Sequence, residues 1–576
     1  MLHTFQFRLC LSLAILCLGS GCPKSPSSES NSQKSGTEPE LKFKFQNITE
    51  SSGVQATYEN GRDAGFYAIL ESMGGGVGLF DLDKDGFTDL VFPGGGKLIK
   101  GDPPSLEGLP LQCYRGLGDL KWSDTSTSTG LGEPQRYTHG VSIADFNNDG
   151  FDDILVTGYG GVDLWENNGD GTFFQVAEQA ELIDDSWSTS AGWGDLDGDG
   201  TLDLYLTHYV DWSFEKNPKC PSPSPSHDED VCPPRRFEGL DDALFRSTGD
   251  GKFQDMSEAW GLAKKGKGLG VVLADIDNDF DIDIYVANDT VDNFLYINDG
   301  TGKLEESALL TGCAVDFEGK TNGSMGLEFF DFDGDLLGDL WVTNYEHESA
   351  ALYRNQGGGN FLHMSQDTGV SAVGELFVSF GTLTRDFDGD ADLDIAIANG
   401  HVIYHPNKST FEQQSTLLEN KGNQKFQRAD FDDASFFSER HVSRGLAGGD
   451  LDRDGRTDLV FTVLNGAAQI LRNETAVKGE RIRMKLIGTT DNRNAIGARV
   501  VLHASKGDRV HFVTGGGSYL SSSEYDCDFY VVDEGTEFSA TVFWPSGKQQ
   551  KLNNLKPATD YFVVQGEANP MQQAAR

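Results

Sequence analysis

The sequence predicts an all-β protein built from a repeated unit, and three observations carry this prediction. An acidic phrase, "DLDKDGFTDLVF" from Asp81, returns six more times with a similar apolar continuation. A second phrase, such as "LYRNQGGGNF" from Leu352, follows most copies and combines an apolar pair, a polar Gly-containing turn and an aromatic residue, which is typical of a β-hairpin. Beyond the first 22 residues no long stretch shows helical periodicity.

Each acidic phrase predicts a turn that binds calcium. Acidic residues at positions 1, 3 and 5 of a tight loop aim their oxygens at one point, which suits a hard divalent cation, whereas carboxylates crowded together without a cation repel one another. A solvated Asp-Gly turn is the commoner explanation of a single copy, but seven copies with one continuation argue against it. We expect up to seven calcium ions, each bound by the side chains at positions 1, 3, 5 and 9 and the backbone carbonyl at position 7. The candidate ligands are Asp81, Asp83, Asp85, Phe87 and Asp89; Asp145, Asn147, Asp149, Phe151 and Asp153; Asp195, Asp197, Asp199, Thr201 and Asp203; Asp275, Asp277, Asp279, Asp281 and Asp283; Asp331, Asp333, Asp335, Leu337 and Asp339; Asp386, Asp388, Asp390, Asp392 and Asp394; and Asp450, Asp452, Asp454, Arg456 and Asp458.

The loops are not EF-hands. An EF-hand requires a bidentate Glu at position 12 and a helix on either side. Position 12 is apolar in every copy, and the residues after position 9 are rich in β-branched and large apolar side chains, which predicts a short strand. We therefore expect each loop to join two strands of a hairpin.

The repeat predicts a seven-bladed β-propeller, because each unit holds about four strands and seven loops imply seven blades. The last unit stops at "ILRNE", Ile470–Glu474, without its final strand. A stray copy of that strand, "FKFQNITESSGV" from Phe43, precedes the first loop. We expect this N-terminal strand to complete the last blade and pair its edge; a leader strand packed on the first blade is the alternative.

The repeats resemble FG-GAP or VCBS repeats, the calcium-loop propeller units also found in integrin α-chains. The phrases that carry the resemblance include "SRGLAGGDLDRDGRTDLVFT" from Ser443 and "LTHYVDW" from Leu206. At the C-terminus, "DNRNAIGARVVL" from Asp491, "GGGSYLSSS" from Gly515 and "WPSGKQQKL" from Trp544 resemble an ASPIC/UnbV domain. The whole chain is similar to bacterial relatives of the cartilage acidic protein family. Three loops depart from the pattern at position 6, where Phe280, Leu336 and Ala391 replace glycine. A left-handed residue other than glycine costs about 1 kcal/mol, so these loops are expected to bind calcium more weakly or to adopt another turn.

The domain organisation follows from these matches and from the leader. Residues 1–22 form a predicted lipoprotein signal peptide, with an apolar run too short to span a bilayer and a Gly-Ser-Gly-Cys end that resembles a lipobox, so Cys22 is the expected lipidation site. An ordinary signal peptide cut nearby is the alternative. Residues 23–40 form a Ser/Pro-rich tether. The propeller is expected over 41–475, the ASPIC/UnbV domain as a small β-sandwich over 476–567, and a tail over 568–576.

Cysteine usage and charge agree with export. Cys220 and Cys232 flank a Ser/Pro-rich segment and are predicted to form a disulfide; metal binding with His227 is the alternative. The formal net charge of −44 excludes a nucleic-acid binder, which needs a basic surface. We expect an exported protein at the bacterial cell envelope or surface, attached to the membrane only through a lipid.

The expected function is a calcium-binding scaffold for adhesion or for binding an envelope or extracellular protein or glycan. No catalytic constellation stands out, so an enzyme is not predicted. The alternative is an envelope hydrolase or lyase acting on polysaccharide at the propeller face. The patch "NGHVIYH", with His401 and His405, is the best catalytic candidate, although a histidine pair on such a loop is more often structural.

Overall fold

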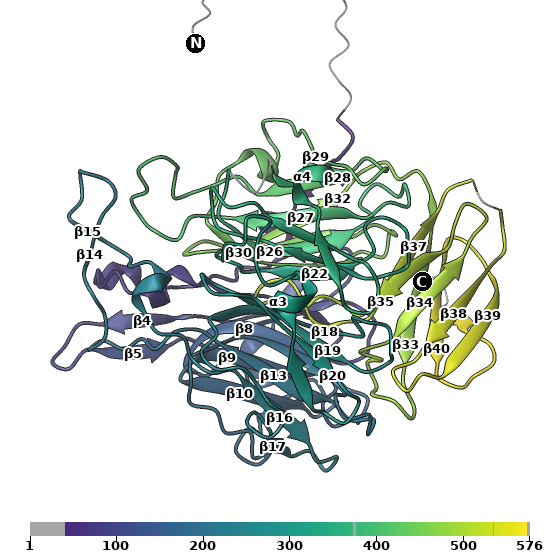
Figure 1. The fold of residues 1–576 in the computed structure, drawn as a ribbon, viewed down its shortest axis with the longest axis horizontal. Coiled ribbons are helices and arrows are strands. Elements are labelled where there is room, and N and C mark those ends of the chain that lie inside the picture. The colour runs from purple at the N-terminus through teal and green to yellow at the C-terminus, as the bar shows by residue number, and fades with distance from the viewer. Residues whose placement is uncertain (1–40, 372–375, 534, 573–576) are drawn as a thin grey trace, which may run out of the picture. The chain divides into compact units, whose positions relative to one another are not determined.

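The computed structural model describes residues 41–371, 376–533 and 535–572, and the regular secondary structure in these ranges is almost entirely β-strand (Figure 1). The predicted all-β fold class is confirmed. Among the described residues, no helix is both long enough and apolar enough to cross a membrane.

Seven antiparallel sheets of four strands each make up the larger part of the chain, and one of them gains a fifth strand from the C-terminal region. In chain order of their acidic loops, the sheets are β2 (Gly78–Phe80), β3 (Asp89–Phe92), β6 (Gln112–Gly116) and β7 (Trp122–Asp124); β8 (Tyr137–Ala144), β9 (Asp153–Tyr159), β10 (Gly161–Asn167) and β11 (Phe173–Gln175); β12 (Ser188–Gly194), β13 (Asp203–His208), β16 (Ala243–Ser247) and β17 (Phe253–Asp255); β18 (Gly268–Ala274), β19 (Asp283–Asn288), β20 (Phe294–Asn298) and β21 (Leu304–Glu306); β22 (Leu327–Phe330), β23 (Asp339–Val342), β24 (Ala351–Asn355) and β25 (Phe361–His363); β26 (Ser379–Arg385), β27 (Asp394–Asn399), β28 (Thr416–Asn420) and β29 (Phe426–Arg428); and β30 (Ser443–Gly449), β31 (Asp458–Val463), β32 (Gln469–Asn473) and β1 (Phe45–Asn47).

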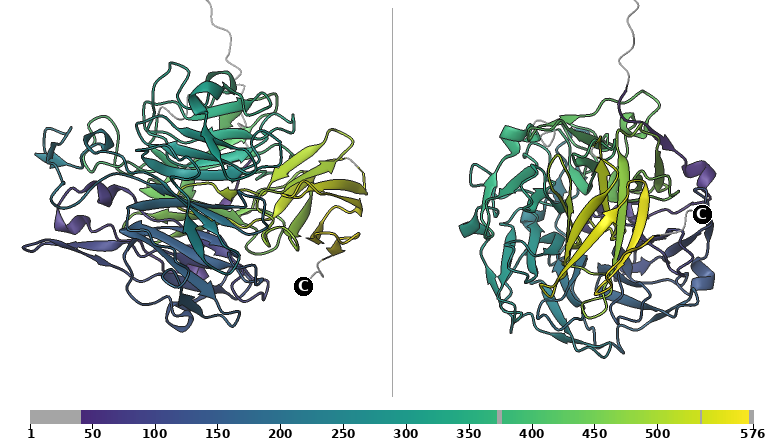
Figure 2. Two further views of the ribbon diagram at one scale, coloured as in Figure 1. Left: turned by 60° about the horizontal axis from the view of Figure 1, so that its bottom comes forward. Right: turned by 90° about the vertical axis from the view of Figure 1, so that its right-hand side faces the viewer.

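The sheets follow one another around a ring, which is seen face-on in the right-hand view of Figure 2. The first strand of each sheet contacts the first strand of the next, from β2 through β8, β12, β18, β22 and β26 to β30, and β30 in turn contacts β2. The side chains between neighbouring sheets are apolar and buried; Val91, Ile154 and Trp165, for example, pack between the first two. Burying apolar surface against both neighbours stabilises every blade, because one small sheet cannot cover its own faces.

The N-terminal strand β1 lies at the outer edge of the last sheet. It pairs antiparallel with β32, with Phe45 opposite Asn473 and Asn47 opposite Leu471. This is the pairing that the sequence predicted from the stray copy at Phe43. Phe43 and Phe45 are buried beside Phe387 and Leu471, so the segment contributes apolar packing as well as backbone hydrogen bonds.

Short elements connect the strands. They are α1 (Thr49–Ser52), η1 (Arg62–Ala64), η2 (Ile69–Ser72), β4 (Gly96–Ile99), β5 (Ser105–Gly108), α2 (Ser126–Thr129), β14 (Cys220–Pro221), β15 (Glu229–Asp230), η3 (Pro234–Arg236), α3 (Ala308–Thr311), α4 (Ser365–Thr368) and η4 (Phe436–Ser438). The β14–β15 hairpin carries the disulfide between Cys220 and Cys232, as the sequence predicted. Cys113, Cys313 and Cys527 are buried and unpaired with one another.

The C-terminal region forms two four-stranded sheets that face each other. One contains β37 (Cys527–Val531), β33 (Glu480–Ile487), β40 (Thr559–Val564) and β41 (Met571–Gln572), and the other contains β35 (Arg509–Phe512), β34 (Arg499–His503), β38 (Phe538–Phe543) and β39 (Gln549–Leu555). Met484, Val500, Phe529 and Trp544 are buried between the sheets. The first sheet is mixed, because β33 pairs parallel with β40. Residues 571–572, which the sequence analysis placed in a tail, form β41.

One segment of this C-terminal region runs into the middle of the ring of sheets. The strand β36 (Gly515–Gly516) pairs with β18, Ser518 pairs with Leu327, and Ser522 pairs with Gly78. The Val141 amide donates to the Leu520 carbonyl at 2.9 Å, and the Gly448 amide donates to Ser523 Oγ at 3.1 Å. The segment 515–523 therefore satisfies backbone groups of innermost strands around the ring and fills its centre, and it joins propeller and sandwich into one compact unit over 41–576.

Candidate metal centre

Each acidic phrase forms the turn between the first and second strands of its sheet, so all seven loops lie at equivalent places in the repeat. In six loops the amide of position 6 donates to one oxygen of the position-1 carboxylate, as from Gly86 to Asp81 at 2.9 Å. A second backbone amide stabilises each turn. The amide of position 7 donates to the position-5 carboxylate in all seven loops, at 2.9 Å for Phe87 to Asp85. The backbone thus holds positions 1 and 5 on the concave side of a common turn.

Two residues of every loop have a left-handed backbone. At position 6 these include Gly86 (φ 85°) and also Phe280, Leu336 and Ala391, with φ of 77°, 69° and 77°. The three loops that lack glycine therefore keep the common turn instead of adopting another one. Position 4 is left-handed as well, from Lys84 (φ 57°) in the first loop to Arg453 (φ 61°) in the last. The surrounding strands impose the turn, and a non-glycine residue there stores strain of about 1 kcal/mol.

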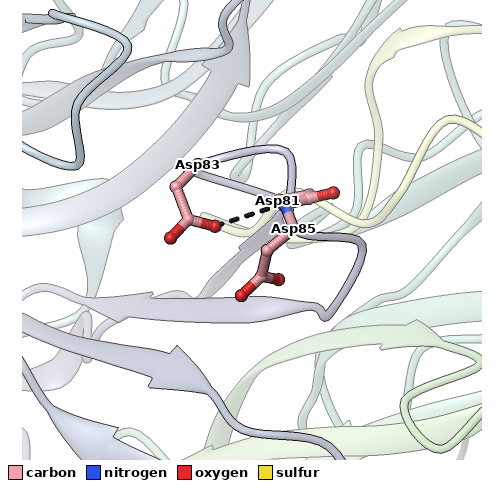
Figure 3. A group of neighbouring side chains, drawn as sticks. All are labelled: Asp81, Asp83 and Asp85. Carbon is pink, nitrogen blue, oxygen red and sulfur yellow. Dashed lines mark hydrogen bonds between the residues drawn. The ribbon is translucent and has the colours of Figure 1, made fainter.

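Carboxylate oxygens converge in at least five of the seven loops. Oxygens of positions 1, 3 and 5 lie within 4.8 Å of one another in the loops that begin at Asp81, Asp195 and Asp275, and those of positions 1, 3 and 9 do so in the loops that begin at Asp331 and Asp386. Figure 3 shows Asp81, Asp83 and Asp85 on their turn, with the Asp85 amide donating to Asp83. Several of these buried oxygens have no hydrogen-bond partner among the described residues, namely Oδ1 of Asp81, Asp197, Asp275, Asp277, Asp333, Asp388 and Asp450.

The aspartate at position 9 has a second role that the sequence did not reveal. In every loop one of its oxygens accepts from the amide of position 2, and the other accepts from an amide of the third strand. For Asp89 the donors are Leu82 and Gly116, both at 2.7 Å. This side chain is at most 1% exposed in all seven copies. It fastens the loop to its sheet, and its remaining lone pairs can still face an ion.

Burial raises the pKa of these position-9 carboxyls, to about 8 for Asp89 and Asp203 and about 9 for Asp339, although hydrogen bonds from backbone amides act in the opposite direction. A carboxyl whose pKa is higher in the folded state than in the unfolded state binds extra protons on folding, so its contribution to stability is lost as the pH rises through the folded-state pKa. In EDTA the denaturant concentration at the midpoint of unfolding should therefore be lower at pH 8 than at pH 7. Calcium holds carboxylates ionised and should flatten this dependence. Chemical denaturation at both pH values, with and without calcium, measures it; an equal slope in the two buffers would contradict it.

A residue of the third strand reaches four of the loops with a positive charge. Arg115, Arg246, Arg354 and Arg472 each form ion pairs with the aspartates at positions 3 and 5. Arg354 Nε lies 2.6 Å from Asp333, and its Nη2 lies 3.1 Å from Asp335. The same register position holds Ile297 in the fourth loop and a glutamate, Glu166 or Glu419, in the second and sixth. This position is not among the candidate site residues predicted from the sequence, although it varies visibly within the repeated phrase "LYRN".

The asparagine that ends the same phrase links neighbouring blades. Asn167 Nδ2 donates to the carbonyl of Leu82 in the preceding loop at 2.8 Å, and Asn298, Asn355 and Asn473 make the corresponding bond at 2.8 to 3.0 Å. Its recurrence in "LWEN", "LYIN", "LYRN" and "ILRN" is the signal that could have identified it.

The C-terminal sandwich lies against the acidic loops. The Asp145 amide donates to Asn494 Oδ1 at 2.8 Å, Lys478 Nζ lies 2.8 Å from Asp390, and Arg481 Nη1 lies 2.8 Å from Asp450. Strand β33 supplies a basic face for this contact, because Arg481, Arg483 and Lys485 alternate with residues buried in the sandwich core. Opposite charges therefore favour this contact.

The histidine patch has a structural environment. His401 is fully buried; its Nδ1 accepts from the Ile403 amide at 3.1 Å, and its Nε2 lies 3.2 Å from Glu346. His405 pairs with Asp230 at 3.1 Å, and its ring stacks on that of His227. Cys220 and Cys232 are joined in a disulfide, so their sulfurs do not form a metal site with His227. Cys22 lies outside the described residues.

Comparison with known proteins agrees with this architecture. A family model described as FG-GAP-like repeat matches residues 81–156, 145–206 and 275–342, and one described as ASPIC and UnbV matches residues 488–570. The chain therefore carries FG-GAP-like repeats and an ASPIC and UnbV domain. The matched repeats contain acidic loops, and the matched domain contains six of the eight sandwich strands (all but β33 and β41) and the segment in the ring.

Curated relatives match most of this chain at low sequence identity. The human protein "Cartilage acidic protein 1" is 24% identical over 528 residues, which cover 86% of this chain and 71% of the relative; the Xenopus tropicalis protein of the same name is also 24% identical and covers 72% and 71%. Matches among solved structures include a lectin of Agrocybe aegerita (17% identity, TM-score 0.36, 70% of this chain and 95% of that one) and YCF48 bound to D1 peptide (10% identity, TM-score 0.37, 75% and 96%).

Proposed function

We propose that the protein is an exported scaffold whose FG-GAP-like loops bind calcium and whose propeller binds a protein or glycan of the cell envelope. The observation that carries the calcium part is the set of buried carboxylate oxygens that converge without a hydrogen-bond partner. An unpaired buried carboxylate oxygen is costly, and a divalent cation with oxygen ligands removes that cost. The candidate ligands in each loop are the side chains at positions 1, 3, 5 and 9 and the backbone carbonyl at position 7.

Calcium titration of the full chain by calorimetry tests this part. Several ions, up to seven, are expected to bind at about 0.1 to 1 mM, the range of extracellular calcium modules. Magnesium should bind poorly, since it requires a tighter octahedral shell. Absence of calcium binding at about 10 mM would refute the proposal.

The ligand part of the proposal is supported by the FG-GAP-like repeats and the propeller-like ring of sheets, which suit a binding scaffold. Binding of the purified protein to washed cell envelopes should require calcium and should saturate. A variant with Asp450→Ala and Asp81→Ala should lose part of this binding if intact loops are needed. Equal, non-saturating binding by both proteins in EDTA would contradict it. The alternative of a hydrolase is not favoured, because His401 is buried, its Nδ1 accepts from the Ile403 amide and its Nε2 lies 3.2 Å from Glu346.

Anchoring by a lipid on Cys22 remains part of the proposal and is supported only by the leader sequence. The variant Cys22→Ser should be released as a soluble product. If the variant still partitions into detergent like the wild type, the anchor is refuted.

The loops are expected to differ in calcium affinity according to the third-strand residue. The guanidinium of Arg354 neutralises Asp333 and Asp335, and calcium must displace it or bind beside a like charge. Replacing it by the residue of the fourth loop, Arg354→Ile, should tighten calcium binding at the fifth loop several-fold. Equilibrium dialysis at about 0.1 mM calcium should then find up to one additional ion per chain.

The reciprocal variant Ile297→Arg provides the matched control and should lose up to one ion under the same conditions. If Arg354→Ile instead binds calcium more weakly than the wild type, the arginine supports the ion and does not compete with it.

A further inference from the structure

A cavity of about 590 Å³ lies between the propeller and the C-terminal sandwich. Its walls come from the loops that begin at Asp81, Asp145 and Asp450 and from strands β33 and β40. Five basic side chains line it: Lys84, Arg453, Arg483, Lys485 and Arg493. This density of positive charge is unexpected in a chain with 46 lysines and arginines against 90 aspartates and glutamates.

At least three of the five acidic residues of the cavity wall have partners in side chains of the protein. Asp450 pairs with Arg481 at 2.8 Å, and Asp152 accepts from Asn494 at 2.7 Å and lies 3.3 Å from Lys84. Glu524 accepts from Thr88 Oγ1 at 2.6 Å. These carboxylates are therefore held by the protein itself.

Three of the basic side chains have no carboxylate partner within 4 Å among the described residues. The ammonium group of Lys485 makes neither an ion pair nor a hydrogen bond with the described residues. The guanidinium of Arg453 stacks over the Phe87 ring at 5.4 Å, and Arg493 Nη1 donates only to the Gly488 carbonyl at 3.3 Å. Burial lowers the pKa of Lys485, but the nearby charges of Asp526, Asp152 and Glu524 outweigh burial and raise it overall, so the ammonium stays charged. Lys485 and Arg453 are half-buried and Arg493 is exposed, so the three charged groups are available to an anion that enters the cavity.

A second cavity under the sandwich has a mainly acidic wall, so basic side chains do not line every cavity next to this domain. It has about 500 Å³, and its wall includes Asp331, Asp333, Asp386, Asp392 and Asp528, with Arg509 as the one arginine or lysine among the described residues. The two cavities thus differ in charge although the same domain covers both.

We propose that the 590 Å³ cavity binds a small oxyanion, such as a sulfate, a phosphate or a dicarboxylate, between Lys485, Arg453 and Arg493. Guanidinium and ammonium groups are the side chains that bind such anions by charge-assisted hydrogen bonds. The volume lies within the range of small-molecule sites. Arg483 and Lys84, which have carboxylate partners, set the positive surroundings.

Calcium should strengthen this site, and only this coupling rests on the proposed function. Asp81 and Asp450 belong to the cavity wall and are calcium-ligand candidates. The wall carries five acidic and five basic side chains, so it is close to neutral until calcium binds in the first and last loops. Each ion adds two positive charges, which favours an anion nearby. By reciprocity the anion should tighten calcium binding by the same factor.

Calorimetric titration of the full chain with sodium sulfate and with sodium malonate, in about 2 mM calcium and at constant ionic strength set by chloride, tests the proposal. Binding with a dissociation constant of about 1 mM or lower is expected for at least one of the two probes, and the comparison separates tetrahedral oxyanions from carboxylates. Lys485→Met and Arg453→Met should each weaken binding at least about tenfold, whereas Lys485→Arg should stay within a few-fold of the wild type. Arg509→Met, in the second cavity, is the matched control and should not change it.

The outcomes are distinguishable. Absence of binding of either anion to the wild type at about 20 mM overturns the site. Undiminished binding in both methionine variants would place the anion elsewhere and would overturn the site. Equal weakening in Arg509→Met would mean that the anion is attracted only by the general charge of the protein, and this too would overturn the site. If Lys485→Met does not fold, Arg453→Met decides. Equal affinity in EDTA and in calcium overturns the coupling and leaves the site standing.

Discussion

In EDTA the protein is expected to unfold at a temperature about 5 to 10 °C below that in 2 mM calcium. An ion that binds only the folded state stabilises it by RT ln(1 + [L]/Kd), which is about 0.6 to 1.8 kcal/mol per loop for dissociation constants of about 0.1 to 1 mM. Seven such loops add about 4 to 13 kcal/mol, as much as the whole stability of many domains. The loss includes the repulsion between carboxylates such as Asp81, Asp83 and Asp85, which converge on one point.

Differential scanning calorimetry in the two buffers measures this effect. Magnesium at the same concentration is the control for ionic strength and should recover only a small part of the shift, since it fits these loops poorly. Superimposable melts in EDTA and calcium would reduce all seven loops to acidic turns.

The second large effect is expected from Tyr519, in the segment that fills the ring. Its side chain is fully buried, its hydroxyl donates to the Met73 carbonyl at 3.1 Å, and its ring meets Phe380 at 5.0 Å between centroids. Tyr519→Ala should destabilise the protein by about 3 to 5 kcal/mol, because it leaves a cavity where innermost strands of several sheets meet. The effect should appear in the unfolding of propeller and sandwich together, as one transition.

Two variants make this result interpretable. Tyr519→Phe removes the hydroxyl alone and should cost about 1 kcal/mol. Phe174→Ala removes an aromatic side chain that is 66% exposed, and it should change stability by less than about 0.5 kcal/mol. Chemical denaturation compares the three. If Tyr519→Ala behaves like Phe174→Ala, or if the sandwich unfolds separately from an unchanged propeller, the segment is not what joins the two parts.

The sequence by itself determined the repeated architecture, because the signals are local and occur seven times. The alternation of an acidic turn with short apolar runs predicts where strands begin, so β3, β9 and the corresponding strands start at the position-9 aspartate. The stray strand at Phe43 predicted the pairing of β1 with β32, and the spacing of Cys220 and Cys232 predicted their disulfide. The convergence of positions 1, 3 and 5 follows from the same local geometry.

Only the tertiary structure decided the features that depend on partners far away in the chain. Gly515–Ser523 contains few apolar residues and resembles a loop, yet it fills the ring, because its backbone bonds to strands hundreds of residues earlier. The position-9 aspartates fasten loops to third strands, and non-glycine residues such as Phe280 keep a left-handed turn, because neighbouring strands fix both ends of each loop. Long-range packing also decides the parallel pairing of β33 with β40. Long-range charge decides the contact between the basic face of β33 and the acidic loops. No local sequence pattern predicts either feature.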